Sequence, residues 1–221
     1  MEKRKIIIGS YNTATTGLWT LAAYKVTKAS QVQNFVEVPG RYAPLDLSTY
    51  LTDGEPYYGS AALEATLESS EGDRAARQAR IDSMVRTLDG RSWNITPPDY
   101  PDHYLVGRVQ IFPNYNDLAH CSVQVSAVCE PWMYEAAETT VSLTATTAEQ
   151  TTTLTNNGSK PVVPTIVTTG AVTLEYDDYS WTLSAGTHIL PDLCLASGTH
   201  ELTYSGSGTI TLTYREAVQA A

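Results

Sequence analysis

Apolar and polar residues alternate one by one through long parts of this chain, which is the pattern of β-strands with one buried face. The clearest case is the segment HCSVQVSAVCEP, where the alternating apolar positions are Cys121, Val123, Val125, Ala127 and Cys129. The same period occurs in residues 61–67, 202–204 and 210–214. The chain is therefore predicted to fold mainly as β-sheet.

One segment breaks this period. In DRAARQARIDSMVRTLDG, steps of three and four residues separate the apolar positions Ile81, Met84, Val85 and Leu88. Asp73 stands where a helix N-cap belongs, and Gly90 stands where a left-handed residue ends a helix. These signals predict a single amphipathic helix near residues 73–89, packed on a sheet.

The 221 residues are enough for two domains of about 100 residues each. We expect an α+β domain over residues 1–136 and an all-β domain over residues 137–221. The second half has about seven short strands at the spacing of a β-sandwich. Within it, Asp177-Asp178 predicts a tight turn, and Ser205 to Gly208 predicts a hairpin loop.

The formal net charge of −10 disfavours general affinity for nucleic acid or anionic membranes. No stretch approaches the roughly 20 apolar residues of a membrane span, and the start MEKRKIII is too short in apolar residues for a signal peptide, so we expect a protein made in a cytoplasm. Cys121 and Cys129 lie about 26 Å apart along one strand, beyond the roughly 7 Å limit for a disulfide. They are predicted to be core thiols.

The chain shows no catalytic or cofactor motif. Its four histidines are scattered without metal-ligand spacing, Cys194 stands alone, and no nucleophile elbow or phosphate loop is present. We therefore expect no enzyme, no cofactor and no metal. Two weaker alternatives are a hydrolase that uses paired carboxylates and a sandwich whose Tyr179 and Trp181 stack on sugars; parity with Leu183 favours burial of these aromatic side chains instead.

The stretch VEVPGRYAPLDLS, residues 36–48, combines a Pro-Gly turn with an arginine. Such a turn fits either a cradle for an anionic ligand or a loop that presents side chains beyond a sheet. A cradle normally uses a helix N-terminus or a second Gly-rich turn, and neither adjoins this stretch. The projecting loop is the favoured interpretation.

The order of these landmarks carries a resemblance. VEVPGRYAPLDLSTYL, a helix ending in LDGRSWNI, DYPDHYLVGRVQI, a strand closing with CEPWMYE, and NNGSKPVVPTIVTTG follow one another in the sequence. Together they resemble the distal tail protein family of siphophages, over nearly all of the chain. The resemblance implies an N-terminal ring-forming domain and a C-terminal galectin-like β-sandwich.

The resemblance also implies a function. It predicts a structural virion protein that forms a homohexameric ring between the tail tube protein and the tail tip or baseplate protein, and lets DNA pass without binding it. Such a protein is assembled in the host cytoplasm and has no membrane partner. The subunit contacts expected are Arg41, Tyr42, Leu45, Asp46 and Arg108. Two alternatives remain: the hub subunit of a tail-like injection or gene-transfer particle, and a carbohydrate-binding sandwich that acts alone.

Overall fold

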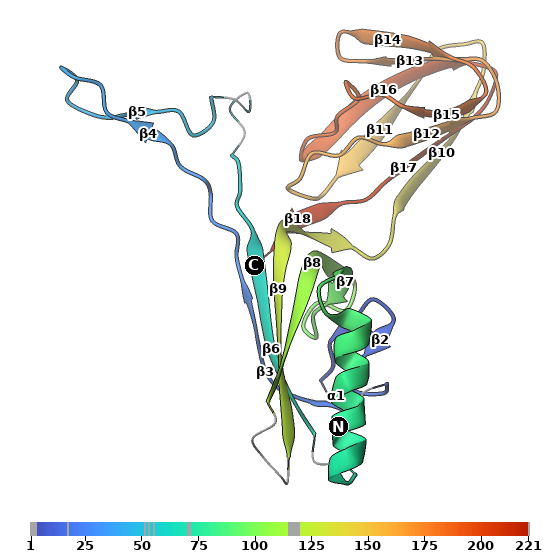
Figure 1. Cartoon of the computed structure of the whole chain (residues 1–221). Coiled ribbons are helices and arrows are strands. Elements are labelled where there is room, and N and C mark those ends of the chain that lie inside the picture. Colours follow the sequence, from blue (N-terminus) through green and yellow to red (C-terminus); the bar gives the residue numbers. More distant parts are fainter. Residues whose placement is uncertain are drawn as a thin grey trace. The chain divides into compact units, whose positions relative to one another are not determined.

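The computed structural model describes residues 4–16, 18–50, 52, 54, 56–69, 72–114 and 120–220 (Figure 1). The chain divides into two compact units. Unit 1 is Met1–Met133 together with Gln219–Ala221, and unit 2 is Tyr134–Val218. The boundary expected from the sequence lies between residues 136 and 137. The division in the structure falls three residues earlier, and it also assigns residues 219–221 to unit 1.

Unit 1 is built on one sheet. Its strands follow the order β2-β1-β7-β8-β9-β6-β3, and β18 pairs with β9 off this path. The bounds are β1 (Ile7–Ile8), β2 (Tyr11–Asn12), β3 (Thr20–Thr27), β6 (Ala61–Ser69), β7 (Ser92–Thr96), β8 (His103–Asn114), β9 (Cys121–Glu135) and β18 (Ala217–Gln219). Strands β6 and β9 pair antiparallel without interruption from Ala61↔Cys129 to Ser69↔Cys121.

The predicted alternation is present in both of these strands. Every second residue of β6 and of β9 up to Cys129 is buried, and the residues between them are exposed or half-buried. Cys121 and Cys129 are free thiols on the buried face, as expected. Burial raises the pKa of the Cys129 thiol to about 11, so this thiol stays protonated and packs as an apolar group.

The helix α1 (Arg74–Leu88) confirms its prediction at both ends. The Asp73 side chain accepts a hydrogen bond of 2.8 Å from the backbone N–H of Ala76, and Gly90 takes a φ of +72° after the last turn. Ile81, Met84 and Leu88 are buried, and the helix packs against β8.

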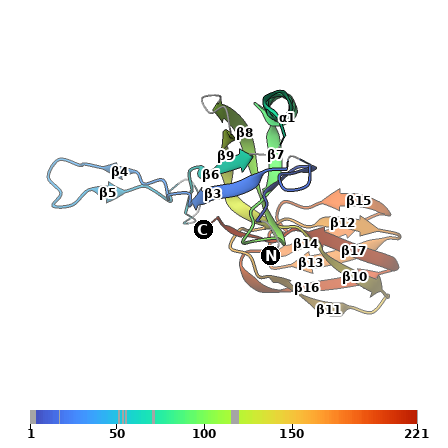
Figure 2. The ribbon, with the colours of Figure 1, turned by 90° about the horizontal axis from the view of Figure 1, so that it is seen from below.

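Unit 2 is a sandwich of two four-stranded sheets. One sheet has the order β10-β17-β12-β15 and the other β11-β16-β13-β14, all labelled in Figure 2. The bounds are β10 (Thr139–Ala145), β11 (Gln150–Asn156), β12 (Thr165–Thr168), β13 (Val172–Tyr176), β14 (Tyr179–Leu183), β15 (Gly186–Ile189), β16 (Gly198–Gly206) and β17 (Gly208–Tyr214). The apolar side chains of both sheets form one core, which includes the fully buried Leu154, Leu174 and Leu212. The fold class is mainly β with one helix among the described residues, as predicted.

One predicted turn is confirmed and the other is wrong. Asp177 and Asp178 join β13 to β14 in a hairpin, with Tyr176 paired to Tyr179. Residues 205–208 form no hairpin, because β16 and β17 belong to different sheets. The chain crosses between the sheets here: the backbone N–H of Ser207 donates to the carbonyl of Ala171, and that of Gly206 to the carbonyl of Thr146.

Close packing at this crossing requires glycine. A Cβ on Gly206 would lie 2.4 Å from the carbonyl oxygen of Ala171, and the residue has a φ of +127°. Gly198, at the other end of β16, has a φ of +118° but nothing within 4 Å of its Cβ position. Comparing the two glycines therefore distinguishes the cost of backbone strain, which is present at both, from the cost of a steric contact, which is present only at Gly206.

We predict that Gly198→Ala lowers the free energy of unfolding by about 1 kcal/mol, because alanine is strained at this φ. Gly206→Ala should lower it by about 3 kcal/mol, because the contact with Ala171 adds to the same strain. Urea denaturation of both variants measures the difference. Equal losses would show that the crossing tolerates a methyl group.

Candidate functional site

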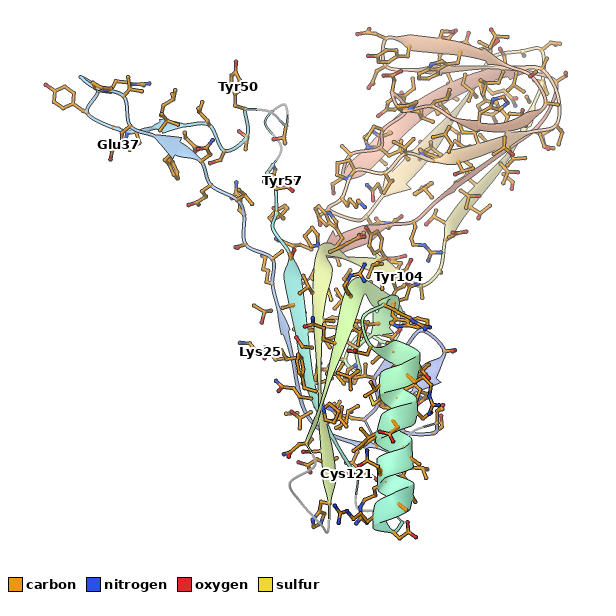
Figure 3. The ribbon with its side chains drawn as sticks, viewed as in Figure 1. Lys25, Glu37, Tyr50, Tyr57, Tyr104 and Cys121 are labelled. Carbon is orange, nitrogen blue, oxygen red and sulfur yellow. The ribbon has the colours of Figure 1, made fainter. Side chains whose placement is uncertain are left out.

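The described residues between 31 and 58 of unit 1, called the arm here, form a long excursion between β3 and β6 that includes the paired strands β4 and β5. Its base is the bridge between Gln31 and Tyr58, and its outer part is the antiparallel pair β4 (Phe35–Val36) and β5 (Leu45–Asp46). Residues 30–46 are all exposed. Figure 3 labels Glu37, Tyr50 and Tyr57 along the arm. The arm thus has paired strands but no core of its own.

Local turn chemistry explains the tip. The backbone N–H of Arg41 donates to the carbonyl of Val38 at 3.1 Å, with Pro39 and Gly40 between them. Gly40 has a φ of +85°, which matches the third residue of a type II turn with proline in the second position. The Pro-Gly turn predicted from the sequence is therefore present. The residues that follow it, up to Pro44, complete an exposed loop.

A hydrogen-bond network closes the hairpin behind the tip. The backbone N–H of Ser48 donates to the Asp46 carboxylate at 2.9 Å, and the Ser48 hydroxyl accepts from the backbone N–H of Asn34 at 2.8 Å. The hydroxyl and the backbone N–H of Ser48 lower the pKa of the Asp46 carboxyl below its usual 3.8. Asp46 is consequently a fixed negative charge on the arm at neutral pH.

The arm exposes large apolar side chains. They are Val32, Phe35, Val36, Val38, Tyr42, Leu45, Tyr50 and Tyr57. Tyr42 at the tip is fully exposed, and Tyr50 is 77% exposed. An isolated two-stranded hairpin is at best marginally stable in water, and a concentration of exposed apolar side chains usually marks an interaction surface. The geometry of the arm suits contact with another macromolecule rather than chemistry on a small one.

The structure places the predicted contact residues in two locations. Arg41 and Tyr42 lie in the tip loop, and Leu45 and Asp46 form β5. Arg108 lies apart from them on β8, where its guanidinium donates to the carbonyl of Gly90 at 2.5 Å. Four of the five predicted contact residues thus lie on the arm, and the fifth lies on strand β8 of the sheet.

Of the exposed aromatic residues of the arm, the sequence predicted Tyr42 as a contact residue but not Phe35, Tyr50 or Tyr57. Val36 and Val38 alternate as core residues of a strand do, yet both are exposed. These three aromatic side chains are also exposed, although they do not belong to that alternation. The only local signal was the density of turn residues between 39 and 60, which predicts loops but not the distance of a loop from a core.

The aromatic pair of unit 2 is partly exposed. Tyr179 and Trp181 stack with ring centroids 5.7 Å apart and an interplanar angle of 9°. Trp181 packs against the sandwich core and Leu183 is buried, as parity predicted. Tyr179, however, is 49% exposed, so its predicted burial is wrong. It lies beside the turn on β14, the end strand of its sheet, where cover from neighbouring strands ends.

Within the described ranges, no group of three or more His, Cys, Asp or Glu side chains is arranged to hold a metal ion. No helix in this part of the chain is long and apolar enough to cross a membrane.

No protein-family model and no curated protein sequence matches the chain. A solved structure does. The crystal structure of the SPP1 Dit (gp 19.1) protein, a paradigm of the hub adsorption apparatus in phages that infect Gram-positive bacteria, matches 96% of this chain and 98% of its own, with a TM-score of 0.70 at 15% identity. The chain has the fold of a phage distal tail protein. The Dit-like fold spans both units, because the match covers nearly the whole chain.

We predict that Phe35→Ser and Tyr42→Ser each change the free energy of unfolding by less than about 0.5 kcal/mol, because Phe35 is more than half exposed and Tyr42 is fully exposed. The fully buried Leu67 is the control, and Leu67→Ala should cost about 2–5 kcal/mol. Urea denaturation at a dilution where light scattering shows monomers checks this. A large loss in the arm variants would mean that the arm packs on its own unit.

Proposed function

We propose that this chain is a structural protein of a phage tail, a hub subunit that joins the tail tube to the tail tip or baseplate. The observation that carries the proposal is the Dit-like fold over 96% of the chain, shared with a hub protein of phage SPP1. In this proposal the chain acts by assembly and catalyses no reaction. It resides in the virion after assembly in the host cytoplasm.

The proposed assembly is a closed ring of six copies. A ring is built from heterologous contacts, so each subunit needs two different complementary surfaces. The arm supports this, since it exposes apolar side chains that its own chain does not cover. We assign Arg41, Tyr42, Leu45 and Asp46 to one of the two surfaces and Arg108 to the other. Unit 1 is then the ring-forming domain.

The charge of the chain agrees with a channel for DNA. Each copy carries a formal charge of −10, which makes about −60 for six. Acidic protein surfaces repel the phosphate backbone, and DNA passing through such a ring would not be held by counterion release. DNA is accordingly a passing cargo in this proposal, and the proposed binding partners are other copies of the chain, the tail tube protein and the tail tip protein. A tail-like injection or gene-transfer particle would use the same subunit in the same way.

A second candidate function is carbohydrate binding by unit 2. The half-exposed Tyr179, stacked parallel on Trp181, offers an aromatic face of the kind that packs on sugar rings. This alternative requires a monomer with affinity for glycans and loss of that affinity in Tyr179→Ala. A glycan array on the wild-type chain and this variant separates the two functions.

We predict that Arg41→Glu weakens ring assembly about fivefold per subunit contact, because it replaces an attractive charge at the contact by a repulsive one. Arg86→Glu, on the exposed side of α1, makes the same change of charge away from the arm and should leave assembly unaltered. Multi-angle light scattering across a concentration series gives the mass, and negative-stain images show whether the particles are six-fold rings.

Two outcomes would contradict the proposal. A wild-type chain that stays monomeric at every concentration, alone and with tail tubes, would exclude the ring. An unchanged hexamer in Arg41→Glu would leave the ring but remove Arg41 from its contacts.

A further inference from the structure

Residues 156–160 of unit 2, called the Asn-Gly loop here, begin at the end of strand β11 and contain a chemically reactive pair. Asn157-Gly158 is the one Asn-Gly dipeptide in the sequence. In such a pair the backbone nitrogen of the glycine can attack the side-chain amide of the asparagine, because glycine has no Cβ to obstruct the approach. Asparagine is one of the thermally labile residues of proteins.

The packing of the loop requires glycine at position 158. Gly158 is buried, and a Cβ there would lie 2.5 Å from the carbonyl oxygen of Ala217 and 2.8 Å from its backbone nitrogen. The backbone N–H groups of Ser159 and Lys160 donate to the same carbonyl oxygen, at 2.9 and 3.2 Å. This close contact with Ala217 therefore keeps the reactive pair in the chain.

The attacking nitrogen is held by a hydrogen bond. The backbone N–H of Gly158 donates to Oδ1 of Asn156 at 2.9 Å. Asn156 is fully buried, and its Nδ2 donates to the carbonyls of Lys160 and Leu195, each at 2.9 Å. Attack requires loss of the Gly158 proton, which would leave the buried Asn156 oxygen without its donor and facing a negative charge. The nitrogen is therefore a poor nucleophile while the loop stays closed.

The asparagine under attack is held by Glu216. The backbone N–H of Asn157 donates to Oε2 of Glu216 at 3.1 Å, and Nδ2 of Asn157 donates to Oε1 at 3.4 Å. Only 5% of Glu216 is exposed, and its Oε1 also accepts from the Thr139 hydroxyl at 3.5 Å. The carboxylate orients the Asn157 amide, and its negative charge disfavours a deprotonated nitrogen at Gly158. The Asn157 side chain is exposed, so water has access to it.

We propose that Asn157 is a site of spontaneous deamidation, and that Asn156 and Glu216 keep it unreactive until the Asn-Gly loop opens. In the reaction the Gly158 nitrogen gives up its proton and bonds to Cγ of Asn157. The Cγ–Nδ2 bond breaks, and the amide nitrogen leaves with that proton as ammonia, which produces a cyclic imide. One water molecule then opens either carbonyl of the imide and leaves aspartate or isoaspartate at position 157. Water is the only co-reactant.

Both products weaken the loop. Aspartate replaces an amide that donates to Glu216 by a carboxylate, and two carboxylates at this distance repel each other. Isoaspartate also lengthens the main chain by one carbon, which displaces Gly158 from its contacts with Asn156 and Ala217. Glu216 therefore opposes the reaction before it occurs and increases the structural damage afterwards.

Peptide mapping by mass spectrometry tests the restraint on the reaction. The whole chain is incubated at mildly alkaline pH, folded in buffer or unfolded in guanidinium chloride. We expect Asn157 to deamidate at least about tenfold more slowly in the folded chain, because attack requires local opening. Glu216→Gln should raise the rate roughly threefold in the folded chain only, because it weakens a charged hydrogen bond and removes the negative charge. Asn156, which precedes another asparagine instead of a glycine, is the internal control.

Equal rates for the folded and unfolded chains would overturn the inference. So would a folded Glu216→Gln variant that reacts no faster than the wild-type chain, since Glu216 would then not restrain the site.

A second test measures the effect of the product on stability. Asn157→Asp reproduces one product and should lower the urea midpoint of unfolding, whereas Asn157→Ser removes the amide without adding a charge and is the matched control. In a Glu216→Gln background, Asn157→Asp should cost much less, because the repelling partner is absent. Equal midpoints for Asn157→Asp and Asn157→Ser would show that the new charge does not act on Glu216, which would overturn its proposed role.

Discussion

The antiparallel pairing of β3 with β6 is the constraint on which the proposed function depends. The two strands are paired from Thr20↔Glu68 to Thr27↔Ala62, and the arm is the chain that connects them. The excursion therefore leaves the sheet as a hairpin already closed at its root. The core ends at this level: Ala29, two residues beyond β3, and Ala61, the first residue of β6, are the buried residues nearest to the arm. Beyond it the hairpin continues with the same strand chemistry but without an opposing layer, so its apolar side chains face solvent.

Local signals in the sequence predicted those parts of the fold that local physics controls. The helix α1 follows from its period, its Asp73 cap and Gly90, since each acts within one turn of the helix. The buried faces of β6 and β9 follow from a two-residue period. The crossing at Gly206 was predicted wrongly for a related reason. Glycine indicates that the chain turns, but the sheet that receives β17 is chosen by distant partners, β10 and β12.

In the candidate site, too, the sequence predicts what adjacent residues control but not what depends on distant parts of the chain. The type II turn at Pro39 and Gly40 was predictable, because it needs only two adjacent residues. The exposure of Val36 was not predictable, because apolar residues alternate in the same way whether or not a second layer of the fold covers the strand. Arg108 was assigned from the order of motifs alone, and its place beside Val128 and Glu130 depends on the pairing of strands distant in sequence. The Dit-like fold at 15% identity fits this view, since periodicity and turn positions persist where individual side chains change.

Approximate free energies indicate how much each kind of side chain would contribute to the proposed contact between subunits. A buried tyrosine removes about 150–250 Å² from water, which at about 25 cal/mol per Å² contributes about 4–6 kcal/mol before the entropy of ordering. An exposed ion pair contributes about 0–1 kcal/mol. Tyr42 would therefore supply most of the affinity. Charged residues such as Arg41 and Asp46 would contribute to the specificity of the contact more than to its affinity. Subunits with a net charge of −10 repel one another at long range, and salt near 0.15 M screens this repulsion beyond about 8 Å. A contact anchored by an apolar side chain is insensitive to that screening, which suits a ring assembled from copies of one acidic chain.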